Sequence, residues 1–183
     1  VWAISSGGHK FWVDGICKRQ GMDKNIDDLF ILAQKYKPLS VGIEVTGQQE
    51  GFIPWIKSEM VKRRIFFNLA SSGNSNRPGI RPNTNKLQRF IVTVPWFKAG
   101  EMFFPEELKN EKVMIEMMEE IRLASGNGLK SKHDDGIDTV SMLAAMSVFL
   151  PDAENPVQYQ EDTGLFAAPT SNVDISPLAT YTV

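Results

Sequence analysis

The sequence predicts an α/β fold in which a mixed sheet is flanked by helices. The chain has 183 residues, of which 42% are hydrophobic, so it can bury one core with little left for a second. Short β-branched runs alternate with longer segments whose apolar residues recur at helical spacing. This alternation is typical of strands joined by helical crossovers. The runs at residues 40–45 and 64–69 are mostly apolar, as in strands that are covered on both faces.

The first half of the chain predicts a hairpin followed by helices and parallel strands. The turn of the hairpin is Ser6-Gly7-Gly8-His9, because glycines supply the positive φ of a tight turn. Lys37-Pro38 ends the first helix. The expected elements are the hairpin strands 1–5 and 10–18, a helix at 26–36, a strand at 40–45, a short helix at 51–58 and a strand at 64–69.

The second half begins with a long segment, residues 70–83, that is rich in Ser, Gly, Asn and Pro. We expect a mobile loop there, and loops of this length are often functional. The elements expected after it are a helix at 85–97, a short strand at 101–104, an amphipathic helix at 106–124, a loop at 125–132 and a last helix from 133 to Pro151. Residues 152–183 have no periodicity and are interpreted as a tail or linker. The predicted domain is therefore residues 1–151.

Composition excludes several classes of protein. The formal net charge is −2, which mildly disfavours tight nucleic-acid binding, although local basic clusters can still bind phosphate. Cys17 is the sole cysteine and suggests a packing residue in a reducing compartment. No apolar stretch is long enough for a membrane span, so we expect a soluble intracellular protein. The sequence contains no GxxxxGK[ST] phosphate loop, paired-cysteine zinc motif or GxSxG elbow.

Glu44 interrupts the apolar run at residues 40–45, where a buried and unpaired charge would be costly. It either lies at an exposed strand end, pairs with an arginine, or faces a metal ion. The last interpretation follows from the position of ligand sites in open α/β sheets, which lie beyond the carboxyl ends of the strands. Glu44 is therefore the first candidate for a catalytic metal ligand.

The second candidate is the segment His133-Asp134-Asp135-Gly136-Ile137-Asp138, which opens the last helix. Asp134 or Asp135 could simply cap that helix, but capping one end does not require three aspartates. At helical spacing Asp138 shares a face with either of them. Clustered carboxylates repel one another, and hard oxygen ligands favour Mg²⁺ or Mn²⁺ over zinc. His133 is open to three interpretations: metal ligand, phosphate contact or surface residue.

The order of these features resembles the ribonuclease-H-like nuclease domain of viral (bacteriophage) large terminases. A hairpin, a helix, a strand bearing Glu44 and a late helix opened by HDDGID follow one another as in that family. The stretch NKLQRFIVTVPWFKAGEMFFP is similar to a family segment in which a Lys and an Arg begin a helix that leads to a Gly and a short Phe-Pro strand. Here these are Lys86, Arg89, Gly100 and residues 102–105. The resemblance covers about residues 1–150.

The resemblance implies a divalent-metal-dependent endonuclease that cuts concatemeric viral DNA during genome packaging in the host cytoplasm. Its partners would be double-stranded DNA, a portal protein and an N-terminal ATPase domain of the same polypeptide, with no membrane. Glu44 and Asp135 would be the acidic ligands, assisted by Asp134 or Asp138. They would hold two Mg²⁺ or Mn²⁺ ions about 4 Å apart. The residues expected to contact DNA are Arg77, Arg81, Lys86, Arg89 and His133.

One departure from the family pattern leaves alternatives open. The family's first acidic ligand is an Asp on the first strand, whereas residues 1–5 correspond to the second strand. We therefore expect the first strand to lie upstream of the given sequence, and Asp14, in mid-strand, to be structural. A non-catalytic docking module for a portal or capsid protein is one alternative. A Holliday-junction resolvase or transposase of the same fold is the other.

Overall fold

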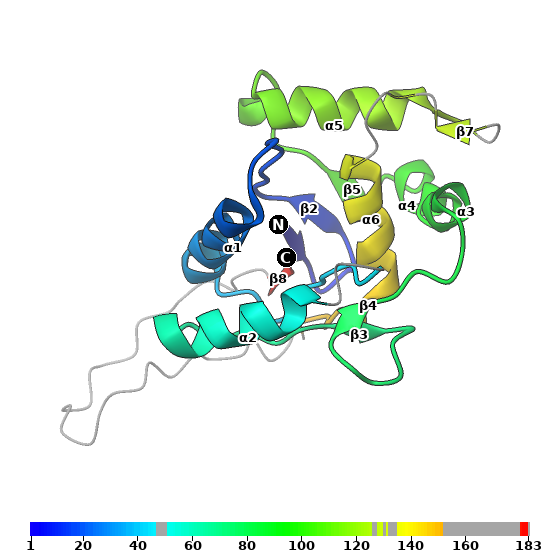
Figure 1. Cartoon of the computed structure of the whole chain (residues 1–183). Coiled ribbons are helices and arrows are strands. Elements are labelled where there is room, and N and C mark those ends of the chain that lie inside the picture. The colour runs from blue at the N-terminus through cyan, green and yellow to red at the C-terminus, as the bar shows by residue number, and fades with distance from the viewer. Residues whose placement is uncertain (47–50, 126–127, 130, 132–134, 152–179, 183) are drawn as a thin grey trace, which may run out of the picture.

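The computed structural model describes residues 1–46, 51–125, 128–129, 131, 135–151 and 180–182. These residues form a mixed α/β fold, which confirms the predicted class at that level. Figure 1 shows the largest sheet near the centre, with α1 to its left, α2 below it, α3, α4 and α6 to its right, and α5 across the top. Among the described residues, no helix is both long and apolar enough to cross a membrane.

The largest sheet is built on the predicted hairpin. Strands β1 (Trp2–Ile4) and β2 (Lys10–Trp12) pair antiparallel, and Gly8 in the turn has a φ of 78°. Strand β5 (Met102–Phe103) lies parallel to β2. Strand β8 (Thr180–Thr182) lies antiparallel to β1. The sheet order is therefore β5-β2-β1-β8.

The structure of this sheet differs from the sequence prediction at two places. The strand predicted to run to residue 18 ends at Trp12, because the chain folds back until a Cβ on Gly15 would lie 2.7 Å from the Trp12 ring. Strand β8 comes from the segment predicted to be a tail. It occupies the outer edge of β1. The rest of that prediction, residues 152–179 and 183, lies outside the described residues.

Helices α1 (Met22–Tyr36) and α2 (Phe52–Arg63) pack through one apolar cluster. Its buried members are Ile26, Phe30, Ile56 and Met60. Helix α2 is longer than predicted, and it ends where Arg64 takes a left-handed conformation. The strand predicted at residues 64–69 is consequently reduced to a parallel bridge between Val41 and Leu69. The strand predicted at residues 40–45 is likewise reduced to isolated bridges, at Val41 and at Glu44.

The predicted mobile loop at residues 70–83 is instead a folded connection. Strands β3 (Ser71–Ser72) and β4 (Gly79–Ile80) pair parallel within it. The buried Asn74 side chain donates hydrogen bonds to the carbonyl oxygens of Arg77 (3.3 Å) and Pro78 (2.9 Å). Gly79 has a φ of 110°, and a Cβ there would lie 2.5 Å from Val45 Cγ1. Glycine is therefore required where β4 packs on residues 41–45, which are called the Glu44 segment below.

The remaining elements cover the other side of the sheet. They are α3 (Lys86–Ile91), α4 (Val94–Lys98), the 3-10 turn η2 (Glu106–Leu108), α5 (Lys112–Leu123), the hairpin β6 (Ala124–Ser125) and β7 (Gly128–Leu129), and α6 (Asp135–Ala145). The helix predicted from residue 106 begins at Lys112, because Pro105 is followed by the 3-10 turn.

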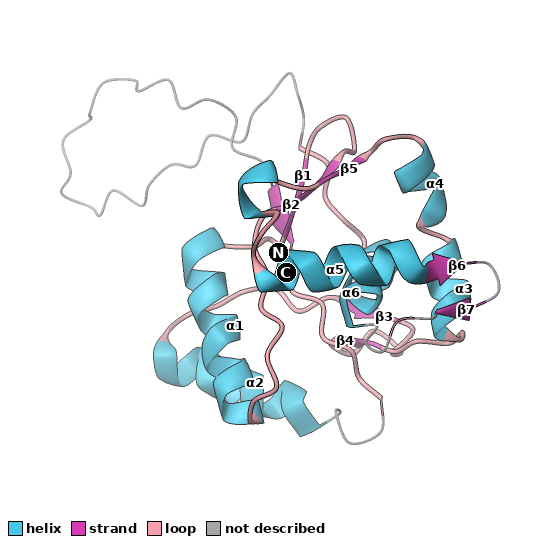
Figure 2. Cartoon of the chain, turned by 90° about the horizontal axis from the view of Figure 1, so that it is seen from above, coloured by secondary structure: helices cyan, strands magenta, loops and turns pink. Residues whose placement is uncertain are grey.

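Three further differences from the sequence prediction lie here. The single helix predicted at residues 85–97 is divided into α3 and α4. The loop predicted at 125–132 contains part of a hairpin, and α6 ends at Ala145 instead of continuing to Pro151. Helices α5 and α6 enclose the second apolar cluster together with Trp2, Ile4 and Trp12. Figure 2 shows α5 lying across α6. This packing sets the position of the first turn of α6, where the aspartates lie.

Candidate functional site

The first turn of α6 is held against α5 by a buried carboxylate. Glu120 is 3% exposed, and its Oε2 accepts a hydrogen bond of 3.0 Å from the backbone N–H of Ile137. A Cβ on Gly136 would lie 2.6 Å from Met117 Sδ and 2.9 Å from Glu120 Oε2. Glycine therefore lets the two helices approach, and Glu120 caps α6 from a neighbouring helix.

Sequence reasoning missed Glu120. The residue lies on the buried face of α5, at helical spacing from Met117 and Val113. A carboxylate on an apolar face was the available signal, because such a charge needs a hydrogen-bond donor when it is buried.

A cavity of about 340 Å³ lies between α6, α5, α1 and the hairpin. Five carboxylates are among its described lining residues: Asp14, Asp28, Glu116, Glu120 and Asp135. No Lys, Arg or His side chain is among those described lining residues. The cavity also contains the thiol of Cys17, whose pKa is raised by burial and by a hydrogen bond to Glu116. This region therefore favours a cationic ligand.

Asp14 is a paired acid of this cavity. Its Oδ2 accepts hydrogen bonds from Tyr36 Oη (2.7 Å) and Lys35 Nζ (2.9 Å), and its Oδ1 accepts one from Gly15 N–H (2.8 Å). Burial raises the pKa of Asp14, but these three hydrogen bonds outweigh burial and leave that pKa below its usual value. Asp14 ties the end of the hairpin to α1, in keeping with the structural role expected for it.

Asp138 is paired as well, on the side of α6 that contacts α3. Its two oxygens lie 2.7 Å from Lys86 Nζ and 3.0 Å from Arg89 Nη2, and its side chain is 13% exposed. Arg89 Nη1 also donates to the carbonyl of Thr84 at 3.0 Å. Asp138, Lys86 and Arg89, which were predicted to bind metal and DNA, thus form an ion-pair cluster that fastens α3 to α6.

Glu44 and Asp135 differ from these acids. Within the described part of the chain, neither carboxylate has a hydrogen bond or an ion pair. Glu44 is half-buried on the segment that bridges to Ile80, and Asp135 is exposed at the start of α6. Asp135 lines the cavity and Glu44 does not, although Gly42, two residues before Glu44, does.

The described residues do not by themselves form a metal centre. No three His, Cys, Asp or Glu side chains among them gather in a way that could hold a metal ion. Of the predicted ligands and DNA contacts, His133 and Asp134 lie outside the described residues. The predicted two-ion site therefore does not fit the described part of the chain alone.

The predicted DNA contacts Arg77 and Arg81 flank strand β4. Both side chains are exposed. Their backbone N–H groups are fixed by hydrogen bonds to the carbonyls of Asn74 (2.9 Å) and Ser72 (2.8 Å). Because Glu44 bridges to Ile80 in β4, the two arginines lie on either side of the strand that neighbours Glu44.

Comparison with known proteins gives no relative from which a role could be carried over. No family model matches the chain, and no curated protein or solved structure is significantly similar to it. The arrangement of the acidic residues is therefore the main guide to function.

Proposed function

We propose that this chain is a ribonuclease-H-like domain that hydrolyses DNA phosphodiester bonds with the help of Mg²⁺ or Mn²⁺, as part of a viral genome-packaging protein. One observation carries the proposal. Glu44 and Asp135 are two of the acids that the sequence singles out, and both carboxylates are without partners in the described part of the chain. The nearby acids Asp14 and Asp138 are paired with lysine or arginine. Unpaired carboxylates remain available to a cation.

The architecture supports the same proposal. An antiparallel hairpin is followed by a helix and by two parallel bridges, the second of which contains Glu44. A late helix begins at Asp135 and packs over the hairpin. The acidic cavity beside Asp135 attracts cations, which would also lessen its repulsion of a phosphate backbone.

The basic residues divide into two groups in this proposal. Arg77 and Arg81 are exposed beside the Glu44 segment and would bind phosphates of DNA, so that binding weakens with salt. Lys86 and Arg89 act chiefly by holding Asp138. Their effect on DNA cutting would come through the position of α6 and of Asp135.

Plasmid cleavage tests the proposal. The full chain incubated with supercoiled plasmid and Mn²⁺ should nick and then linearise it, without strong site preference. Glu44→Ala and Asp135→Ala should each abolish cutting. Glu107→Ala, which removes an exposed acid of η2 that does not line the cavity beside Asp135, should leave it unchanged. Cutting retained by both variants would contradict the assignment, and preferential cutting of four-way junctions would favour a resolvase.

A non-catalytic docking role is the second candidate. It is favoured by the absence of a metal-holding group among the described residues. A chain that does not cut DNA under any divalent metal but binds a portal ring in a pull-down would support this candidate over the nuclease.

A further inference from the structure

Helix α5 has apolar side chains on two opposite faces. Met114, Met117 and Glu120 are buried against the core. On the opposite face, Ile115 is 52% and Leu123 37% exposed, and Met118, which is partly buried against the core, lies at the edge of that face. A helix in contact with a single core needs only one apolar stripe. The second stripe is therefore a surface without a partner in the described part of the chain.

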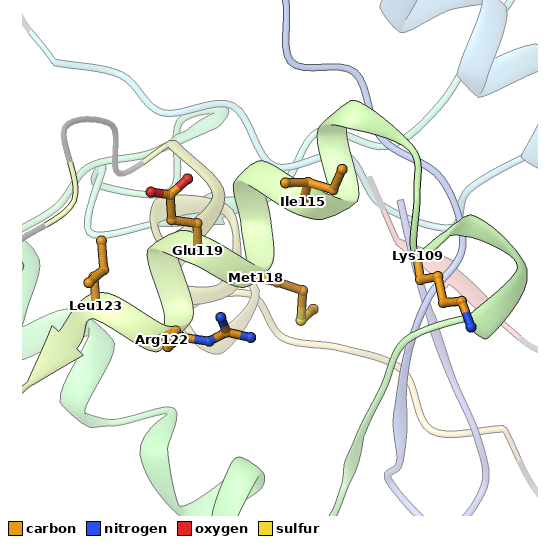
Figure 3. A pocket seen from close by; sticks show the side chains of 6 residues that line it. All are labelled: Lys109, Ile115, Met118, Glu119, Arg122 and Leu123. Atoms are coloured by element: carbon orange, nitrogen blue, oxygen red, sulfur yellow. The ribbon is translucent and has the colours of Figure 1, made fainter.

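Two opposite charges lie within this outer stripe. Glu119 and Arg122 are exposed and one helical turn apart, yet within the described residues neither has an ion pair. Together with Ile115, Met118, Leu123 and Lys109 they line an open hollow of about 530 Å³ (Figure 3). Figure 2 shows that no described element lies over this side of α5.

We propose that this face of α5 binds the same face of a second copy of the chain, with the two helices antiparallel. The stripe is complementary to itself, because it carries one acid and one base beside apolar residues. A twofold axis between positions 120 and 121 places Glu119 of each copy opposite Arg122 of the other. The same register places Met118 opposite Leu123 of the second copy. Both charges are thereby paired and both apolar side chains are covered.

The size of the face sets the strength of the pairing. Helix α5 spans 12 residues, or about 18 Å at the usual rise per residue. A single helix pair of this length falls in the class of small, transient interfaces. The dimer should therefore form in a concentration-dependent way, with a dissociation constant on the order of 10–100 µM. It should weaken in high salt, since exposed charges are screened.

Sedimentation equilibrium of the full chain at rising concentration tests this pairing. Wild type should approach twice the monomer mass, and Glu119→Arg or Arg122→Glu should each lower the dimer affinity at least about five-fold, because like charges then face one another. The double variant, in which Glu119→Arg is combined with Arg122→Glu, should recover most of the affinity. Recovery distinguishes a direct pair from a loss of folding.

Two controls complete the test. Leu123→Glu should abolish the dimer while circular dichroism stays unchanged, because Leu123 is exposed, whereas Val61→Glu, on the exposed side of α2 (69% exposed), should leave the dimer intact. The proposal is overturned if wild type stays monomeric up to about ten times the expected dissociation constant. It is equally overturned if a dimer forms that neither charge reversal affects.

Discussion

Asp135 and Asp138 lie one turn apart on α6, but their surroundings are opposite. Asp138 is held between Lys86 and Arg89 on the side that faces α3. Asp135 faces a cavity whose described lining has four further carboxylates and no basic side chain. Two aspartates of one short motif therefore have different roles. The paired one fastens two helices, and the unpaired one keeps its charge available for a ligand.

The largest effect on stability should come from the paired aspartate. Asp138→Ala leaves Lys86 and Arg89 close together without their counter-charge, and Arg89 is 15% exposed. We expect the free energy of unfolding to fall by about 2–4 kcal/mol, as is usual when one partner of a largely buried pair is removed. Urea unfolding measures this.

The matched variant is Asp135→Ala, which should change the free energy of unfolding by less than about 0.5 kcal/mol because an exposed, unpaired residue is removed. If both variants lose the same free energy of unfolding, the two aspartates do not differ in their contribution to stability.

The cap supplied by Glu120 should have a smaller effect. Glu120→Ala removes the acceptor for the Ile137 N–H and leaves that donor buried, at a cost of about 1–3 kcal/mol. Glu120→Gln keeps an oxygen that can accept the hydrogen bond and should cost less. Thermal unfolding followed by circular dichroism compares the two, and a glutamine variant as unstable as the alanine variant would contradict the capping role.

Asp14 extends the comparison to a paired acid of the cavity itself. Its pKa in the folded chain lies below the usual 3.8, so on acidification the unfolded chain takes up a proton first. The stability contributed by Asp14 is present above that usual value and is lost as pH falls through the lower folded pKa. Asp14→Asn should therefore flatten the decline in stability below about pH 4. If the stability of the variant declines with falling pH as steeply as that of wild type, Asp14 does not contribute to the decline.

Cys17 reports on the charge of the cavity and should show the smallest effect. Burial and the neighbouring Glu116 raise the pKa of its thiol, with Asp135 among the further contributors. Asp135→Asn should accelerate iodoacetamide alkylation at pH 8 by roughly two-fold, the size expected for one charge in a partly solvated setting. Glu107→Gln should have no effect. Identical alkylation rates in wild type and Asp135→Asn would place Asp135 outside the electrostatic reach of the cavity.

Local patterns in the sequence were enough to predict the α/β class, the hairpin turn and the presence of helices, but not the bounds of several of those elements. The Gly7-Gly8 turn and the periodic apolar residues of α1 act within a few positions of themselves. The shortening of the strand at 64–69 was not predictable in this way, because it depends on where α2 ends. Strand β8 pairs with β1 across almost the whole chain, a contact that no local pattern indicates.

The site was predicted as a set of acidic positions, but not as an arrangement. The sequence singled out Glu44, Asp134, Asp135 and Asp138 by their residue type, and Asp134 lies outside the described residues. The pairing of Asp138 with Arg89 spans 49 positions, so the sequence could not separate the structural aspartate from the available one. Likewise, the folding of residues 70–83 depends on Asn74 and on the contact of Gly79 with Val45.

Titration calorimetry with Mn²⁺ in the absence of DNA tests the central claim most directly. If Glu44 and Asp135 are the available ligands, the wild-type chain should bind Mn²⁺, and Glu44→Gln and Asp135→Asn should each weaken binding at least about ten-fold. Glu107→Gln should bind as wild type does. Equal Mn²⁺ binding by all four proteins, or none by wild type, would contradict the account.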